Sequence, residues 1–301
     1  MSSASPPKPD QATARWVVKS PPPGIATPRG EALPRVVERI LATRGIAGTA
    51  EREAFLQPKL ANLADPFELP EMNPAVERLL EAIDGHEKIA LFGDYDVDGV
   101  TSLTLLKTVL VSYGADVGTF LPHRVDEGYG LSLEGIERCL SQHSPKLLVA
   151  VDCGTTSISE AEWLRERGVD LIILDHHEAS PDGRPQCHAL VNPKAGIAGQ
   201  GAEFSYLCSA GVVFKLAHAL VKTRPIDGFD LRDYLDVVAV GTVADIVPLV
   251  DENRALVRRG LLELARTRNA GLAALTEVSG INPPYGALDI GFRIGPRLNA
   301  A

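Results

Sequence analysis

Residues 91–102 read Leu-Phe-Gly-Asp-Tyr-Asp-Val-Asp-Gly-Val-Thr-Ser, so three carboxylates alternate directly after a short apolar run. Asp94, Asp96 and Asp98 would repel one another at neutral pH unless a cation lay between them. A hard divalent metal ion is the simplest explanation for this crowding. An acidic surface turn, or a loop around a single structural cation, is the alternative interpretation of this stretch.

The apolar segment at 88–93 is typical of a buried strand, and residues 99–113 carry the apolar spacing of a helix. The three acids are therefore expected at the carboxyl end of a strand, next to the amino end of a helix. Free backbone N–H groups at a helix start favour anions. Open α/β sheets place their ligands at this edge, so the segment predicts a functional site there.

The same pattern occurs twice more along the chain. Residues 146–151 form a second apolar run that ends in Asp152, and 171–174 form a third that ends in Asp175, His176 and His177. Adjacent histidines between acids at the functional end of a strand are more typical of a site than of a core. We expect these three strand ends to converge on one set of acid and imidazole groups.

A fourth acid, Asp245, is the single charge in the apolar run 237–250. A buried carboxylate without a partner would be strongly unfavourable or would become neutral. The sequence leaves open whether the partner of Asp245 is a helix cap, an arginine or a metal ion.

The order of the expected elements indicates the fold class. Strands are expected at 88–93, 116–121, 146–151, 170–175 and 189–191, and they alternate with helices at 99–113, 132–141 and 157–167. This alternation predicts an α/β fold with a doubly wound parallel sheet and right-handed crossovers. Further helices are expected at 31–43, 71–83, 206–222, 231–241, 252–266 and 271–278, and those after residue 205 would carry Asp245 back over the sheet edge.

Composition limits the kind of protein. A net charge of -9 and a pI near 5.3 argue against nucleic-acid binding by overall basicity, and an aromatic content of 5% leaves few stacking platforms. A chain of this charge could bind nucleic acid only through bound metal ions and local basic residues. Four widely spaced cysteines indicate neither a zinc cluster nor a disulfide framework. No apolar run is long enough to span a bilayer and no signal-peptide core is present, so a cytoplasmic location is expected.

The motifs resemble those of a known family. Residues 93–99, Asp152, 175–177 and 241–245 resemble the four motifs of the DHH phosphoesterase superfamily. Segments 122–131, 247–254 and 295–300 are similar to its branch of single-stranded-DNA exonucleases. The resemblance implies phosphodiester hydrolysis from 5′ to 3′ with release of mononucleotides, in DNA repair and recombination. It also implies single-stranded DNA as the partner, together with a single-strand-binding protein and a helicase, and no membrane.

Two metal ions are expected at the site, because a pair of divalent ions can orient an attacking water and neutralise the leaving oxygen. Mixed carboxylate and imidazole ligation suits Mn²⁺ better than Mg²⁺, which is the alternative. The expected ligands are Asp96, Asp98, Asp152, His176 and Asp245, with Asp94 as a further ligand or as an acceptor that orients one.

The remaining expected site residues would act on the substrate. His177 is assigned to the scissile phosphate as a donor or general acid, because two metal-bound rings would leave nothing to meet the developing charge. Asp175 is expected to fix a histidine tautomer. The resemblance implies phosphate contacts by Arg124, Arg297 and Asn299. Thr155 is a further candidate for such a contact, with helix capping as its alternative.

The expected domain organisation has three parts. Residues 1–30 are rich in Pro, Ser and Ala and are expected to form a disordered leader. The catalytic domain is expected over 31–280, with an α/β core at about 86–192 and a helical part at about 205–280. Residues 281–301 would begin a connector, truncated before a second domain that the resemblance implies.

Two alternative functions stay open at this stage. The chain is also compatible with a small-substrate member of the superfamily, which would cleave short oligonucleotides, cyclic dinucleotides or pyrophosphate. The other alternative is a truncated, non-catalytic DNA-binding fragment.

Overall fold

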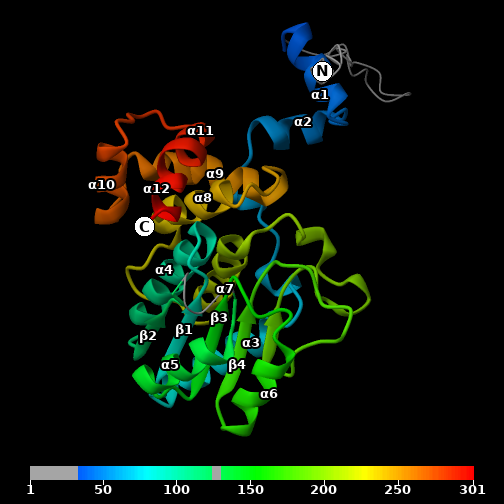
Figure 1. Cartoon of the computed structure of the whole chain (residues 1–301). Coiled ribbons are helices and arrows are strands. Elements are labelled where there is room, and N and C mark those ends of the chain that lie inside the picture. The colour runs from blue at the N-terminus through cyan, green and yellow to red at the C-terminus, as the bar shows by residue number, and fades with distance from the viewer. Residues whose placement is uncertain (1–32, 124–129) are drawn as a thin grey trace, which may run out of the picture. The chain divides into compact units, whose positions relative to one another are not determined.

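The computed structural model describes residues 33–123 and 130–301 (Figure 1). The chain divides into two compact units, with the boundary between Gln57 and Pro58. The described part of the first unit contains α1 (Arg35–Thr43) and α2 (Thr49–Leu56). The expected leader at 1–30 lies outside the described residues, and the domain bounds expected from the sequence stay predictions.

The second unit is built around a five-stranded parallel sheet. Its strands are β1 (Ile89–Gly93), β2 (Val117–Phe120), β3 (Leu147–Val151), β4 (Asp170–Leu174) and β5 (Ala189–Val191), in the order β2-β1-β3-β4-β5. The crossovers carry α4 (Val97–Ser112), α5 (Leu133–His143) and α6 (Ile158–Glu166). The chain reverses its direction of travel across the sheet between β1 and β3, and the carboxyl ends of strands at such a switch point form a ligand-binding crevice.

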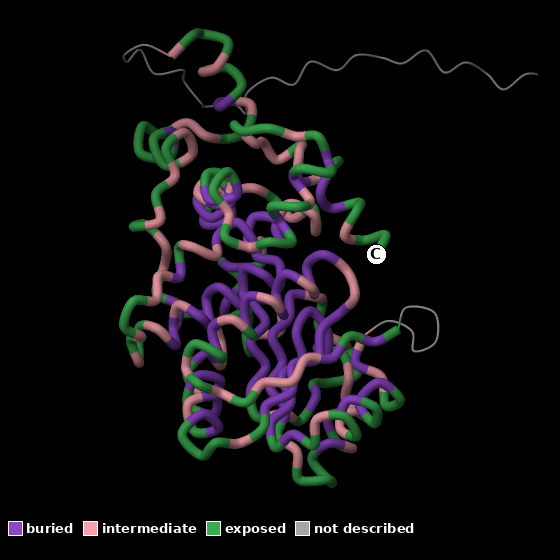
Figure 2. The backbone as a smooth tube through the Cα atoms, turned by 90° about the vertical axis from the view of Figure 1, so that its left-hand side faces the viewer, coloured by how far each residue is buried: buried purple, intermediate pink, exposed green. Residues whose placement is uncertain are grey.

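Helices cover both faces of the sheet. Leu91 and Val149 belong to a core shared with α3 (Met72–Asp84), α4 and α7 (Ser209–Thr223), whereas Phe92 and Ala150 belong to a core shared with α5 and α6. Successive strand residues point to opposite faces, and both faces are buried, which explains why the strands are continuous apolar runs. The buried backbone in Figure 2 follows these central strands.

A helical part follows the sheet. It consists of α8 (Leu235–Ala244), α9 (Asp251–Leu264), α10 (Ala270–Val278), α11 (Ala287–Asp289), a π-helix (Ile290–Ile294) and α12 (Gly295–Asn299). Its apolar core includes Val240, Val257 and Ile290. Short 3₁₀ turns occupy Leu60–Asn62, Pro66–Glu68, Ile197–Gly199, Ala202–Phe204 and Leu231–Tyr234.

The predicted fold class is confirmed, with the element bounds shifted at several ends. The helix expected at 99–113 begins earlier, at Val97, because Asp96 caps it. The helix expected at 231–241 is instead a 3₁₀ turn followed by α8, which continues to Ala244. Neither α2 nor the helical turns at 287–299 were expected from the sequence. In the described part of the chain, no helix combines the length and the apolar character that crossing a bilayer would require.

Candidate metal centre

Two of the alternating acids lie in the turn between β1 and α4. Asp94 directly follows β1 and is buried, and one of its carboxylate oxygens accepts a hydrogen bond from the Tyr95 N–H at 2.7 Å. Asp96 caps α4 by accepting the N–H of Gly99 at 2.9 Å. A Cβ at Gly99 would lie 2.4 Å from the Asp94 carbonyl oxygen, so the turn needs glycine to bring these carboxylates together.

The third alternating acid is held by the start of another helix. Asp98 is buried, and its two carboxylate oxygens accept the backbone N–H groups of Ser209 at 2.7 Å and Ala210 at 2.9 Å, at the amino end of α7. Burial raises the pKa of Asp98 to about 6, although these N–H groups favour its charged form. The carboxylate is therefore fixed in position before any ligand binds.

Asp152 directly follows β3, and its carboxylate lies close to that of Asp98. Its backbone φ is 63°, in the left-handed region that few side chains adopt, and its carboxylate accepts the Ser209 hydroxyl at 2.8 Å. Burial and then the neighbouring Asp98 raise its pKa well above the usual range. Ser209 thus connects two of the acids through its backbone and its side chain.

His176 lies among three carboxylates. Its Nε2 is 3.5 Å from Asp152 Oδ1, and it lies 3.6 Å from an Asp245 oxygen and 3.8 Å from an Asp98 oxygen. Burial lowers the pKa of His176 to about 4, so the ring is neutral at pH 7. Both ring nitrogens are buried without a hydrogen-bond partner among the described residues.

Asp245 directly follows α8, and its carboxylate is the third of those around His176. Its Oδ2 is buried and has no hydrogen-bond partner among the described residues. Burial raises its pKa to about 7, and Asp98 contributes further. Gly241 lets α8 approach closely, because a Cβ there would lie 2.4 Å from the Thr101 hydroxyl oxygen of α4.

The donor atoms fit a divalent metal centre. Within the described residues, three groups each have ligand atoms within 4.8 Å of one another, namely Asp94 with Asp96 and Asp152, Asp152 with His176 and His177, and Asp98 with Cys208 and Asp245. Buried polar atoms without a hydrogen-bond partner and crowded carboxylates lower the stability of the fold unless a cation compensates them. Oxygen donors with an imidazole nitrogen suit Mn²⁺ and related ions.

Asp175 and His177 form a separate pair beside these ligands. The His177 ring contacts Asp175 Oδ1 through Nδ1 at 2.7 Å, and the same oxygen accepts the N–H groups of His176 and His177. Burial opposes the charge on Asp175, but these hydrogen bonds together hold its pKa below the usual range. The hydrogen bond to Asp175 raises the pKa of His177 in turn, so this imidazole favours its cationic form.

A family model described as the DHH family, N-terminal domain, matches residues 88–242. The chain belongs to the DHH family. The four motifs that carry the resemblance supply the acids and histidines described above.

Several DHH proteins are similar over most of this chain. The single-stranded-DNA-specific exonuclease RecJ of Bacillus subtilis is 39% identical over 88% of the chain, and that of Thermus thermophilus is 36% identical over 83%. Two solved structures match the fold, an exonuclease RecJ bound to manganese (TM-score 0.68, 36% identity, 77% of this chain and 57% of that one) and Thermus thermophilus RecJ in complex with Mn²⁺ (TM-score 0.70, 33% identity, 87% and 36%). The chain spans 33% of the length of the Bacillus relative and 35% of the Thermus relative.

Two residues that support the metal centre were not predicted from the sequence. Ser209 links Asp98 and Asp152, and Asn192 is fully buried, where it donates to the Thr155 hydroxyl at 2.8 Å and to the His177 carbonyl oxygen at 2.9 Å. The position of Asn192, directly after β5 and at the carboxyl edge of the sheet, was a usable signal. No comparable signal marked Ser209, because its role depends on where α7 packs.

Three of the four residues expected to contact the substrate are within the described part of the chain. Thr155 is buried, and its N–H donates to Asp175 at 3.1 Å. Asn299 accepts the N–H of Val97 at the start of α4 at 3.2 Å, and the exposed Arg297 donates to the Arg293 carbonyl oxygen at 2.6 Å. Arg124 lies outside the described residues. The substrate roles of these four residues stay predictions.

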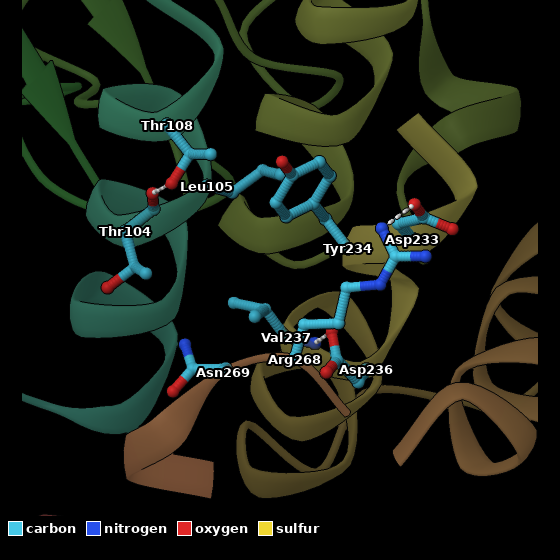
Figure 3. Close-up of a pocket in the computed structure, with 9 residues that line it drawn as sticks. All are labelled: Thr104, Leu105, Thr108, Asp233, Tyr234, Asp236, Val237, Arg268 and Asn269. Carbon is cyan, nitrogen blue, oxygen red and sulfur yellow. Dashed lines mark hydrogen bonds and ion pairs between the residues drawn. The ribbon is translucent and has the colours of Figure 1, made fainter. Parts of the chain in front are cut away.

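A cavity of about 230 Å³ lies elsewhere in the second unit. It is lined by Thr104, Leu105, Thr108, Asp233, Tyr234, Asp236, Val237, Arg268 and Asn269 (Figure 3). It shares none of the residues of the metal centre. Its buried Asp236, which accepts the Val237 N–H at 2.7 Å, offers a matched control for substitutions of the buried acids.

The raised pKa of Asp245 predicts a pH-dependent gain in stability on substitution. A carboxyl whose pKa rises to about 7 in the folded state contributes stability that is full below its unfolded pKa, and loses this contribution as the pH rises through about 7. With metal chelated, Asp245→Asn should therefore raise the melting temperature more at about pH 8 than at about pH 5. Equal effects at both pH values in thermal melts would show that Asp245 is not a strained, buried acid.

Proposed function

We propose that this chain is the nuclease part of a metal-dependent single-stranded-DNA exonuclease, which hydrolyses phosphodiester bonds from 5′ to 3′ and releases mononucleotides. The observation that carries the proposal is the neutral His176 nitrogen facing the carboxylates of Asp98, Asp152 and Asp245. The names of the RecJ relatives support the choice of single-stranded DNA. The direction of hydrolysis and the mononucleotide product come from the family resemblance.

The proposed metal ligands are those expected from the sequence. Asp96, Asp98, Asp152, His176 and Asp245 would hold two Mn²⁺ ions, or Mg²⁺, with Asp94 beside them. Divalent ions bound there supply Lewis acidity and neutralise the charge that builds up during phosphodiester hydrolysis. The two carboxylate oxygens of Asp98 keep lone pairs for a cation while they accept the N–H groups of α7, because each carboxylate oxygen carries two acceptor sites.

His177 supplies the proton in this proposal. Asp175 holds the Nδ1 side of the ring, so the Nε2–H of the cationic imidazole is the proton that can be given away. The oxygen of a water molecule bonds to phosphorus and gives one of its protons to the solvent, while the bond from phosphorus to the leaving oxygen breaks and that oxygen takes the proton from Nε2. The solvent then returns a proton to the neutral ring, so that atoms and charge balance over one turnover. Asp175 stays ionised and keeps the ring oriented throughout.

Substrate length separates this function from the small-substrate alternative. With Mn²⁺, a long single-stranded oligodeoxynucleotide should be degraded with a higher kcat/KM than dinucleotides, cyclic dinucleotides or pyrophosphate. Chromatography of the products over time measures both the preference and the mononucleotide product. A clear preference for dinucleotides or pyrophosphate would instead place the chain with the small-substrate members.

Metal titration separates the function from a non-catalytic fragment. Isothermal titration calorimetry of the chelator-treated protein with Mn²⁺ should show saturable binding. His188, an exposed residue just before β5 at the opposite edge of the sheet, provides a control because His188→Ala should leave this binding unchanged. Absence of Mn²⁺ binding to the folded wild-type chain would favour the non-catalytic alternative.

The cellular setting is proposed by the same resemblance. We infer a role in DNA repair and recombination in the cytoplasm. A single-strand-binding protein and a helicase are the protein partners that this role implies.

A further inference from the structure

The metal centre is strongly acidic, so a DNA strand that approaches it needs cationic contacts close by. Lys194 is one such group, three residues beyond the end of β5. Its ammonium pairs with the Glu178 carboxylate at 3.2 Å, and Glu178 directly follows His177. The positive charge of Lys194 offsets part of the rise in the pKa of Asp245 and adds to the lowering of the pKa of His176, which agrees with its place beside the centre.

The backbone that carries Lys194 is anchored to the catalytic histidine. The Asn192 Oδ1 accepts the Lys194 N–H at 2.8 Å, while the Asn192 amide group donates to the His177 carbonyl oxygen at 2.9 Å. Asn192 is fully buried, so these hydrogen bonds are shielded from water. One buried side chain therefore links the backbone at His177 to the backbone at Lys194.

The ion pair between Lys194 and Glu178 is exposed enough for another anion to replace the Glu178 carboxylate. The Glu178 side chain is 83% exposed and that of Lys194 is 25% exposed. An ion pair in contact with water contributes little to stability, whereas a phosphate offers several charged oxygens to an ammonium group. A phosphate can therefore replace the Glu178 carboxylate at little cost.

We infer that Lys194 contacts a backbone phosphate of the bound DNA strand, and that Glu178 holds the ammonium in its place until a strand binds. This inference rests on the proposed function, since it names a substrate contact of the same site. Asn192 is the positioning residue that keeps this contact in register with His177.

Lys222 offers a matched control. It forms an equivalent exposed pair, with its ammonium 2.6 Å from Asp65 Oδ2. It lies in the last turn of α7, whereas Ser209 at the first turn contacts the metal centre. At a rise of about 1.5 Å per residue, the two ends of α7 are roughly 20 Å apart. Lys222→Gln thus removes a similar charge far from the expected path of the strand.

Binding measurements test the inference. Fluorescence anisotropy of a labelled, 5′-phosphorylated oligothymidylate, with Ca²⁺ replacing Mn²⁺, compares the wild type with Lys194→Gln, Glu178→Gln and Lys222→Gln over a series of salt concentrations. Lys194→Gln should weaken binding roughly fivefold and reduce the salt slope by about 0.7, as expected for one lost phosphate contact on a single strand. Glu178→Gln should tighten binding, because the competing carboxylate is gone, and Lys222→Gln should change little.

The outcomes separate this inference from the proposed function. A wild-type chain that neither binds nor hydrolyses single strands overturns both. A wild type that binds the strand, with Lys194→Gln of unchanged affinity and salt slope, overturns the Lys194 contact while the proposed function stands. A weaker-binding Glu178→Gln variant would show that Glu178 supports the strand instead of competing with it, and it would overturn the exchange.

Discussion

Asp152→Asn should lower hydrolysis of single-stranded DNA by at least about 100-fold and weaken Mn²⁺ binding, because substitutions that merely touch a ligand's surroundings already cost 10- to 100-fold. Asp152 contributes to two of the three groups of close donor atoms, more than any other residue of the described part of the chain. Asparagine keeps the shape of the side chain and tolerates the φ of 63°, which alanine would adopt only at a cost. Activity assays together with Mn²⁺ calorimetry measure the effect.

The fold should survive this substitution. The carboxylate of Asp152 is buried beside Asp98, and its raised pKa shows that its charge is unfavourable in the absence of a cation. We therefore expect the metal-free variant to melt no lower than the wild type at neutral pH. Asp236→Asn, at a buried acid outside the centre, should retain full activity. An active Asp152→Asn variant would contradict the assignment of Asp152 as a ligand.

His177→Ala should lower kcat by roughly 10²- to 10³-fold while Mn²⁺ affinity and KM change little, because general acid catalysis contributes about this much. The expectation follows from the hydrogen bond between His177 Nδ1 and Asp175, which orients the ring and raises its pKa. Steady-state kinetics and Mn²⁺ calorimetry on the same preparations separate the two effects, with His188→Ala as the control.

Collapse of Mn²⁺ binding in His177→Ala would assign this histidine to the metal instead. The ligand atoms of Asp152, His176 and His177 lie within 4.8 Å of one another, so His177 is close enough to bind the same metal ion as the other two. Asp175→Asn then serves as a second measurement, because loss of the carboxylate should lower the pKa of His177 and reduce kcat without removing a ligand.

The sheet and its acidic edge were predictable from local patterns. Fully buried parallel strands are continuous apolar runs, and Asp94, Asp152 and Asp175 each directly follow such a run. Carboxyl ends of parallel strands share one edge of the sheet, so residues far apart in sequence were expected to meet there. The structure places these three acids at that edge.

The parts of the site that come from helices were less predictable, because they depend on packing between elements. Asp245 reaches His176 because α8 approaches α4 closely at Gly241, and nothing in the run 237–250 specifies that approach. Ser209 acts through the amino end of α7, which begins later than the apolar spacing indicated. The path of 287–299 past the start of α4, which brings Asn299 to Val97, likewise depends on tertiary contacts.

The most direct measurement is an anomalous-scattering map from crystals of the chain soaked in Mn²⁺. We predict two peaks at the carboxyl edge of the sheet, with Asp152, His176 and Asp245 among the side chains that contact them. Peaks confined to other surfaces, or a map without a peak beside Asp152, would contradict a metal-dependent nuclease centre.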